Sequence, residues 1–297
     1  MRSTVPRIKR LRPDPIPAIH PLPEYLSTGQ RAEWYLDTKR VLQVPWMGVV
    51  TMAYSHYPTF FGELWRGLKP LCESRSFVEA SQGLRRHVEA RTAELAPRSL
   101  VGPLTRLGYA SREIENIRQM NTVFSHGNQP YVLIAAIVQH LLEVGDMAGG
   151  KEAEPYEGRH APEFQVPFLL MEPHHADEPT RALYEDIEAT LELPFVNTDY
   201  RAFARWPSYF ALAWADLREV AGRPDHEAIC QECHDRVAEL AAEGLPNPGG
   251  LSSDVLRQAA VTDASLEEVV QMCRLFQWLL PGLITNVAYF RHQLDDV

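Results

Sequence analysis

The chain has 297 residues, 45% of them hydrophobic, and a formal net charge of −10 with a pI near 5.6. This length allows one large or two ordinary domains with real cores. The acidic balance argues against nucleic acid as the main partner, because phosphate binding needs clustered lysines and arginines. No apolar run approaches the roughly 20 residues that span a bilayer, so we expect no membrane association.

The first 29 residues are predicted to form an extended, proline-rich arm. Six prolines fall within the first 23 residues, where a secreted protein would carry a hydrophobic signal core. The four cysteines form no paired framework, which is typical of a reducing compartment. We therefore expect a cytoplasmic protein. The basic residues of the arm are Arg2, Arg7, Lys9, Arg10 and Arg12, and the cysteines are Cys72, Cys230, Cys233 and Cys273.

Apolar residues recur with helical spacing, and one such pattern occurs twice. Residues 60–68 place aromatic and leucine side chains on one helix face, and residues 209–217 repeat that face. The surrounding segments 35–68 and 184–217 align without a gap at an offset of 149, with nine of 34 positions identical. No stretch alternates with the period of a strand, so a large sheet is not expected.

The duplication continues towards the C-terminus. Residues 111–142 match residues 263–294 at an offset of 152. We predict a proline-rich arm (1–29), a first helical repeat (30–144), a polar linker (145–179) and a second helical repeat (180–297). The expected fold is all-α, with two tandem repeats related by a pseudo-two-fold axis in one compact pseudo-dimer and the active site between them.

The two copies differ at a carboxylate. Where the first copy has Val50, the second has Asp199, within the stretch Asn197-Thr198-Asp199. Asparagine, threonine and aspartate are also preferred at the start of a helix, so a capping role is an alternative on residue type alone. The first copy crosses the same segment without such residues. A buried carboxylate can serve as a general base, which is the second interpretation of Asp199.

A second difference is the stretch Ser125-His126-Gly127-Asn128, whose counterpart is Gln277-Trp278-Leu279-Leu280. An amide facing a carboxylate could fix a water molecule or a substrate group. The alternative is a Gly-Asn turn between two helices.

The spacing Cys230-x-x-Cys233-His234, with His226 one turn upstream, contains residue types that bind zinc. Structural zinc sites normally pair two such knuckles, and a single one is present, inside a helical pattern. No metal is therefore expected.

These motifs resemble the group I (D,L-specific) 2-haloacid dehalogenases, all-helical proteins built from two related halves. The chain does not resemble the Rossmann-type haloacid dehalogenase superfamily. The resemblance covers most of residues 30–295. It rests on four motifs: Tyr184-Glu-Asp-Ile-x-x-Thr-Leu191, Thr198-Asp199-Tyr-x-Ala-Phe-Ala-x-Trp206-Pro207, Phe124-x-x-Gly-Asn128-x-x-Tyr131 and Val44-Pro45-Trp46.

The resemblance implies an SN2-type displacement of halide from a 2-haloalkanoic acid by water, with inversion and without a covalent intermediate. It implies that Asp199 is the general base and that Asn128 orients the nucleophile. Trp46 and Thr198 would line the substrate pocket. No metal or organic cofactor is implied, because an in-line attack needs a fixed nucleophile and a desolvated leaving group.

The chain departs from the family pattern at three pocket positions. Val49 replaces an aromatic residue, Phe276 replaces a tyrosine, and His126 stands where a tyrosine precedes Gly-Asn. These departures leave open a related reaction, seen in aziridine-forming proteins of azinomycin-type pathways. There, a substrate amine would attack a neighbouring carbon and expel sulfate.

A third interpretation is a non-catalytic helical partner protein, which the proline-rich arm and acidic surface would suit. The expected partner of the enzyme is a small-molecule substrate. A homodimer, or a second protein that completes the pocket, also stays open.

Overall fold

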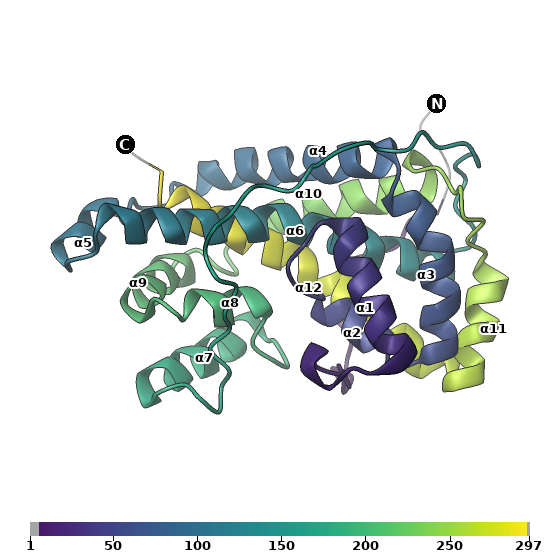
Figure 1. Cartoon of the computed structure of the whole chain (residues 1–297), viewed down its shortest axis with the longest axis horizontal. Coiled ribbons are helices and arrows are strands. Elements are labelled where there is room, and N and C mark those ends of the chain that lie inside the picture. The colour runs from purple at the N-terminus through teal and green to yellow at the C-terminus, as the bar shows by residue number, and fades with distance from the viewer. Residues whose placement is uncertain (1–5, 296–297) are drawn as a thin grey trace. The chain divides into compact units, whose positions relative to one another are not determined.

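The computed structural model describes residues 6–295. Within this range every regular element is a helix, and β-type pairing is limited to one isolated bridge between Ser74 and Pro155 (Figure 1). The all-helical prediction is therefore confirmed. The α-helices are α1 (Gly29–Leu42), α2 (Val49–Tyr54), α3 (Pro58–Cys72), α4 (Arg75–Thr92), α5 (Val101–Arg106), α6 (Ser111–Glu143), α7 (Glu178–Leu191), α8 (Thr198–Phe203), α9 (Pro207–Arg218), α10 (Pro224–Glu239), α11 (Ser253–Asp263) and α12 (Leu266–His292). Shorter helical turns are η1 (Glu24–Leu26), η2 (Ala93–Leu95) and η3 (Leu240–Gly244).

Helix boundaries in the first and second parts of the chain follow the sequence offset. Helices α1 and α7 have 14 residues each and begin at residues 29 and 178, a difference of 149. Helices α2 and α8 have six residues each and begin at residues 49 and 198, again 149 apart. Both α1 and α7 end at a residue with left-handed backbone, Gln43 at φ 52° and Glu192 at φ 54°. A left-handed residue stops a helix by turning the chain away from its axis.

The chain divides into two compact units, and each takes segments from both sequence halves. Unit 1 contains the chain up to Leu84, Gly127–Ala161 and Gln231–Pro281. Unit 2 contains Arg85–His126, Pro162–Cys230 and the chain from Gly282 on. The boundaries fall inside α4, α6, α10 and α12, so these helices contribute residues to both units. The domain boundaries expected from the sequence repeat stay a prediction.

The proline-rich arm belongs to unit 1 and contacts its segment Gln231–Pro281. Ile8 is buried, and the Arg7 guanidinium lies 3.3 Å from a carboxylate oxygen of Glu239 and 2.8 Å from one of Glu243. The Arg10 side chain donates a hydrogen bond to the backbone carbonyl of Trp278 at 3.1 Å. The arm up to η1 contains no α-helix over residues 6–23, while residues 1–5, including Arg2, lie outside the described part of the chain.

Helix α3 is the centre of packing in unit 1 and contacts α1, α2 and α11. The face predicted from residues 60–68 is buried, with Phe60, Phe61 and Leu64 fully inaccessible to solvent. Two glycines let α3 approach the segment before α11, since a β-carbon added at Gly249 would lie 2.1 Å from the carbonyl oxygen of Gly67. Helical periodicity therefore predicts the buried face, and small residues set how closely the next segment packs.

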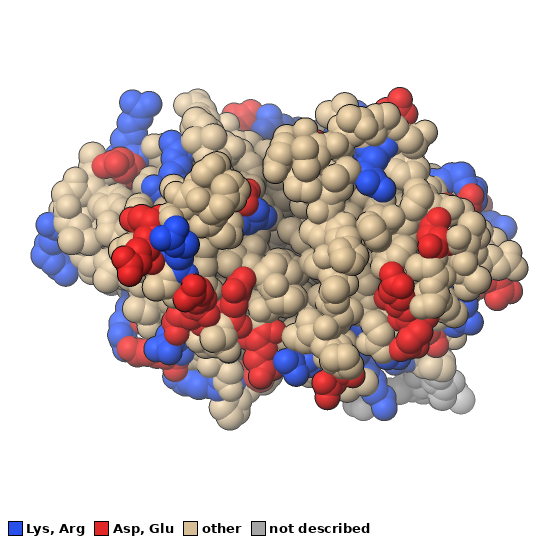
Figure 2. All heavy atoms as spheres, turned by 90° about the horizontal axis from the view of Figure 1, so that it is seen from below, with Lys and Arg blue, Asp and Glu red and all other residues tan. Residues whose placement is uncertain are grey.

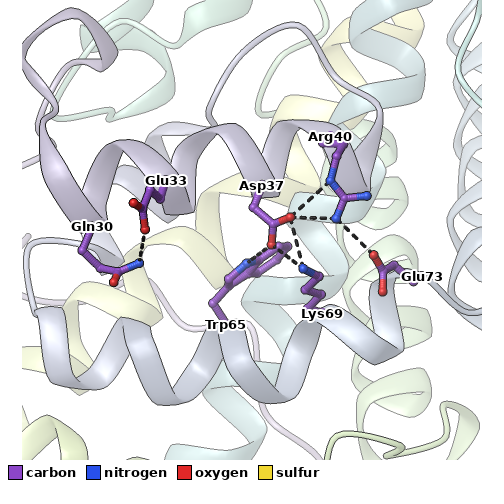
Figure 3. Close-up of polar contacts among 7 residues, drawn as sticks. All are labelled: Gln30, Glu33, Asp37, Arg40, Trp65, Lys69 and Glu73. Carbon is purple, nitrogen blue, oxygen red and sulfur yellow. Dashed lines mark hydrogen bonds and ion pairs between the residues drawn. The ribbon is translucent and has the colours of Figure 1, made fainter.

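A carboxylate ties α1 to α3 at the edge of this core (Figure 3). The indole N–H of Trp65 donates to Asp37 at 3.0 Å, and Lys69 lies 2.9 Å from the same carboxylate. Arg40 donates to its other oxygen at 2.7 Å and also lies 3.3 Å from Glu73. Burial acts to raise the pKa of Asp37, but the hydrogen bonds from Arg40, Lys69 and Trp65 outweigh it, and the pKa is lowered overall.

Unit 2 contains the corresponding arrangement on α7 and α9. The indole N–H of Trp214 donates to Asp186 at 2.7 Å, and Arg218 lies 2.9 Å from the same carboxylate. Each of these residues stands 149 positions after its counterpart in unit 1: Asp186 after Asp37, Trp214 after Trp65 and Arg218 after Lys69. Identical tryptophan and aspartate residues at aligned positions thus make the same contact within each unit.

The surface is acidic overall but mixed in local charge. Figure 2 shows carboxylates interspersed with lysine and arginine side chains over one face of the molecule. Among the described residues, no helix combines the length and apolar character needed to cross a membrane.

Candidate active-site residues

The base predicted from the sequence lies at the start of the short helix α8 in unit 2. Asp199 is 2% exposed, and Thr198 before it is 6% exposed. Asn197 occupies the N-cap position with an extended backbone (φ −60°, ψ 155°), but its side chain makes no capping hydrogen bond. The stretch therefore lies at the start of a helix, as the capping interpretation expects. Capping does not explain why Thr198 and Asp199 are buried.

An arginine two residues after Asp199 fixes the start of α8. The Arg201 guanidinium donates to both carboxylate oxygens of Glu172, at 2.9 and 2.8 Å, and to the Thr198 hydroxyl at 3.2 Å. The backbone N–H of Met171 donates to the Arg201 carbonyl at 2.9 Å, so the segment before α7 is held along α8. Both bonds to Glu172 come from Nη1 of Arg201 and are charge-assisted, which makes them stronger than hydrogen bonds between neutral groups.

Sequence reasoning did not select Arg201 or Glu172. The available signal was the repeat itself, because Met52 occupies the aligned position in the first copy. Glu172 lies in the linker, 29 residues before its partner, and no local pattern connects the two.

The stretch from Ser125 to Asn128 lies inside α6 and not in a turn between helices. The turn alternative for Gly127 is therefore wrong. The glycine serves close packing instead, because a β-carbon at Gly127 would lie 2.4 Å from the Trp46 ring and 2.9 Å from Val44. A helix interior satisfies its own backbone hydrogen bonds, so the missing side chain, and not an unusual backbone angle, explains the glycine here.

The first two residues of this stretch belong to unit 2. Ser125 donates to a carboxylate oxygen of Glu89 at 2.6 Å. Burial acts to raise the pKa of Glu89, while the bond from Ser125 and the charges of Arg85 and Arg291 lower it below its usual value. His126 is buried at 7% exposure.

Asn128 and the remaining pocket candidates belong to unit 1. Asn128 is 4% exposed and follows Gly127, against which the Trp46 ring packs. The Tyr131 hydroxyl donates to the Trp46 backbone carbonyl at 2.9 Å, which fixes the segment before α2 against α6. The fold of unit 1 therefore brings Trp46 against Gly127, the residue before Asn128.

The two departures from the family pattern in unit 1 lie in different surroundings. Val49 is the first residue of α2 and is partly exposed, whereas Val50 after it is 2% exposed. Phe276 is 1% exposed and its ring meets that of Tyr54 edge-on at 6.0 Å. Val50 aligns with Asp199, so the first copy buries a valine where the second buries an aspartate.

A separate group of possible metal ligands occurs in the first turns of α10. Side-chain atoms of His226, Glu227 and Cys230 lie within 4.8 Å of one another. Cys233 and His234, which completed the spacing noted in the sequence, do not belong to this group. His234 Nδ1 lies instead 3.0 Å from Asp235.

The chain matches no family model but has close relatives among characterised proteins. It is 44% identical over 252 residues to the (R)-2-haloacid dehalogenase of Rhizobium sp. (strain NHG3), covering 84% of this chain and 96% of that protein. It is 36% identical over 284 residues to the (R)-2-haloacid dehalogenase of Pseudomonas putida, covering 93% and 92%.

Solved structures give the same result. A D-2-haloacid dehalogenase mutant in complex with D-2-CPA has a TM-score of 0.87 and 31% identity, covering 97% of this chain and 99% of that one. A D-2-haloacid dehalogenase in complex with L-LA matches with the same score, identity and coverage. The fold is that of all-helical dehalogenases, and the protein is a hydrolytic enzyme that acts on a small molecule. The chain belongs to the 2-haloacid dehalogenase family.

Membership in this family decides among the interpretations drawn from the sequence. Hydrolytic dehalogenation by displacement is the activity of the chain, and the protein is an enzyme rather than a non-catalytic partner. Neither the relatives nor the structures above are named for aziridine formation, and that alternative gains no support from them.

Proposed function

We propose that the chain hydrolyses (R)-2-haloalkanoic acids, with Asp199 as the general base. Water attacks the α-carbon, the carbon–halogen bond breaks, and Asp199 accepts one proton from the water. The products are halide and the 2-hydroxy acid of inverted configuration. The preference for the (R)-enantiomer comes from the two relatives that are more than a third identical, both (R)-2-haloacid dehalogenases.

The observation that carries this proposal is the burial of Asp199 at 2% exposure in a chain of this family. Removing a carboxylate from water costs folding free energy, so an acid kept at a buried position favours a functional role. The aligned Val50 is buried equally at 2%, so packing at this position accepts an apolar side chain.

The other predicted residues have supporting roles in this proposal. Asn128 would orient the water, while Trp46, Thr198, Val49, His126 and Phe276 would shape the substrate pocket. The contact of Trp46 with Gly127, the residue before Asn128, supports a fixed position for the indole against α6. Arg201, one helical turn after Thr198, supports it through a hydrogen bond to the hydroxyl.

The test is chloride release from (R)- and (S)-2-chloropropanoate, with chiral separation of the lactate formed. We expect (S)-lactate from the (R)-substrate, no release with Asp199→Asn, and near-normal release with Asp186→Asn. Asp186 is the matched control because its carboxylate binds Trp214 and Arg218 on the scaffold. Active, folded protein that releases no chloride from either enantiomer would refute the proposal.

A second measurement separates direct attack by water from an ester intermediate. With enzyme in excess and solvent enriched in ¹⁸O, direct attack places ¹⁸O in the product of the first turnover. An ester of Asp199 would instead deliver an unlabelled carboxylate oxygen to that product.

A further inference from the structure

We propose that Asn286 and His226 are positioning residues, which hold the helix of the base through a buried hydrogen-bond relay to Tyr200. This inference rests on the proposed role of Asp199. The relay uses residues of unit 2 alone: Tyr200 on α8, Asn286 on α12 and His226 on α10.

The hydrogen bonds of the relay are continuous. Asn286 donates through Nδ2 to the Tyr200 hydroxyl at 3.0 Å, and its Oδ1 lies 2.9 Å from Nε2 of His226. Exposure is 0% for Tyr200, 2% for Asn286 and 3% for His226, so water cannot replace these partners easily. Tyr200 directly follows Asp199 on α8, so a rotation of this helix would move the carboxylate and the Tyr200 hydroxyl together.

The bonding pattern fixes the tautomer of the histidine. Because Nδ2 of Asn286 donates to the tyrosine, its Oδ1 must accept, and Nε2 of His226 must carry the proton. Nδ1 of His226 then faces Cys230, whose sulfur lies 3.8 Å away. The Cys230 thiol also lies 3.7 Å from the Thr285 hydroxyl, next to Asn286 in the chain. The His226 end of the relay thus continues to Cys230 and Thr285.

The charge of Asp199 also acts on the Tyr200 hydroxyl. Burial is the main cause of the raised pKa of Tyr200, the hydrogen bond from Asn286 acts in the opposite direction, and the charge of Asp199 raises the pKa further. The phenol therefore stays neutral beside the carboxylate. Ring packing supports its position, because Tyr200 stacks on Phe210 with centroids 6.1 Å apart.

The aligned positions of the first copy lack this relay. Tyr200 aligns with Thr51 at the offset of 149, and Asn286 aligns with Ile134 at the offset of 152. His226 and Phe77 are each the third residue of their helices, α10 and α4, which begin 149 positions apart. Thr51 bonds locally, donating to the Gly48 carbonyl at 2.9 Å. Packing at two of the three positions therefore accepts apolar side chains. The polar relay occurs in the copy that carries Asp199, which is expected if it serves the base.

A matched contact elsewhere in unit 2 provides the control. Asn121 on α6 donates through Nδ2 to the Tyr209 hydroxyl on α9, also at 3.0 Å, and both residues are fully buried. The asparagine–tyrosine bond has the same atoms, length and burial as the Asn286–Tyr200 bond, although Asn121 also donates to the Ile117 carbonyl. Tyr209 lies on α9 and not beside Asp199. Comparing the two asparagines separates a role in positioning from a contribution to stability.

The experiment compares Asn286→Leu with Asn121→Leu for kcat, KM and melting temperature, using (R)-2-chloropropanoate. We expect both variants to lose similar stability. Asn286→Leu alone should lower kcat, on the order of 10- to 100-fold, with KM nearly unchanged, since small misplacements of a reacting group have effects of this size. His226→Gln, which retains an N–H donor, should keep more activity than His226→Leu. Tyr200→Phe removes only the hydroxyl and is the variant of choice if Asn286→Leu does not fold.

Hydrogen exchange gives a readout independent of turnover. The amides of residues 198–203 should exchange faster in Asn286→Leu and Tyr200→Phe than in Asn121→Leu. Equal kcat and equal exchange in both asparagine variants would overturn the relay, even if Asp199→Asn proves inactive. If the wild-type protein instead releases no halide, the proposed function fails, and the exchange result still decides whether the relay holds α8.

Discussion

Gly127 and Trp46 are in direct contact: a β-carbon added to the glycine would lie 2.4 Å from the edge of the indole ring. The backbone of the tryptophan is also held, because Tyr131 donates to the Trp46 carbonyl at 2.9 Å. Glycine is needed inside α6 at this point because no other residue leaves room for the indole. The two residues together fix the position of the tryptophan against α6.

Gly127→Ala should therefore impair both stability and catalysis. Adding a methyl group to a packed core typically costs about 1–3 kcal/mol, and here the indole must move to admit it. We expect a lower free energy of unfolding in urea and a raised KM for 2-chloropropanoate. Gly102→Ala on α5 is the control, since its β-carbon would meet only Arg106 at 3.5 Å. That variant should be neutral or slightly stabilising.

Trp65→Phe and Trp214→Phe should destabilise their units to a similar extent. Each removes an N–H donor from a carboxylate, at 3.0 Å for Asp37 and 2.7 Å for Asp186. We expect a loss of about 1–2 kcal/mol each, because such bonds contribute less when the carboxylate is partly exposed. Urea unfolding of each variant measures the loss of stability. A double mutant that combines Trp65→Phe with Asp37→Asn tests whether the two residues are coupled. Strict additivity of Trp65→Phe and Asp37→Asn would contradict the proposed coupling.

The low pKa of Asp37 predicts a dependence of stability on pH. A carboxyl whose pKa is lowered on folding contributes stability that is fully present above its unfolded value, near 3.8. That contribution is lost as the pH falls through the lower folded value. The free energy of unfolding of Asp37→Asn should thus fall less steeply below pH 4 than that of the wild type. Parallel curves for the two proteins would show that the Asp37 network adds no pH-dependent stability.

Gly249→Ala should be strongly destabilising, because its β-carbon would lie 2.1 Å from the carbonyl oxygen of Gly67. The clash is with backbone, which cannot rotate away, so we expect a loss of at least about 3 kcal/mol. Gly150→Ala is the matched control, since nothing lies within 4 Å of its β-carbon. Thermal unfolding of both variants checks this expectation. A Gly249→Ala protein as stable as Gly150→Ala would mean that the two segments are less closely packed.

Local sequence pattern was sufficient to predict the helical face of residues 60–68, because helix burial repeats every three to four residues. It failed at Gly127. A Gly-Asn pair favours a turn by local preference, but the packing of α6 around Trp46 overrides that preference. The pairing of Arg201 with Glu172 was also missed, since nothing in either segment points to the other.

The sequence by itself determined the all-helical class, the family and the choice of Asp199, because helical periodicity and motif similarity are properties of short segments. The tertiary structure decided the burial of Asp199 and the path from Tyr200 through Asn286 to His226. The physical reason is chain distance. Hydrogen bonds between residues 60 and 86 positions apart depend on how helices pack, and no local pattern contains that information.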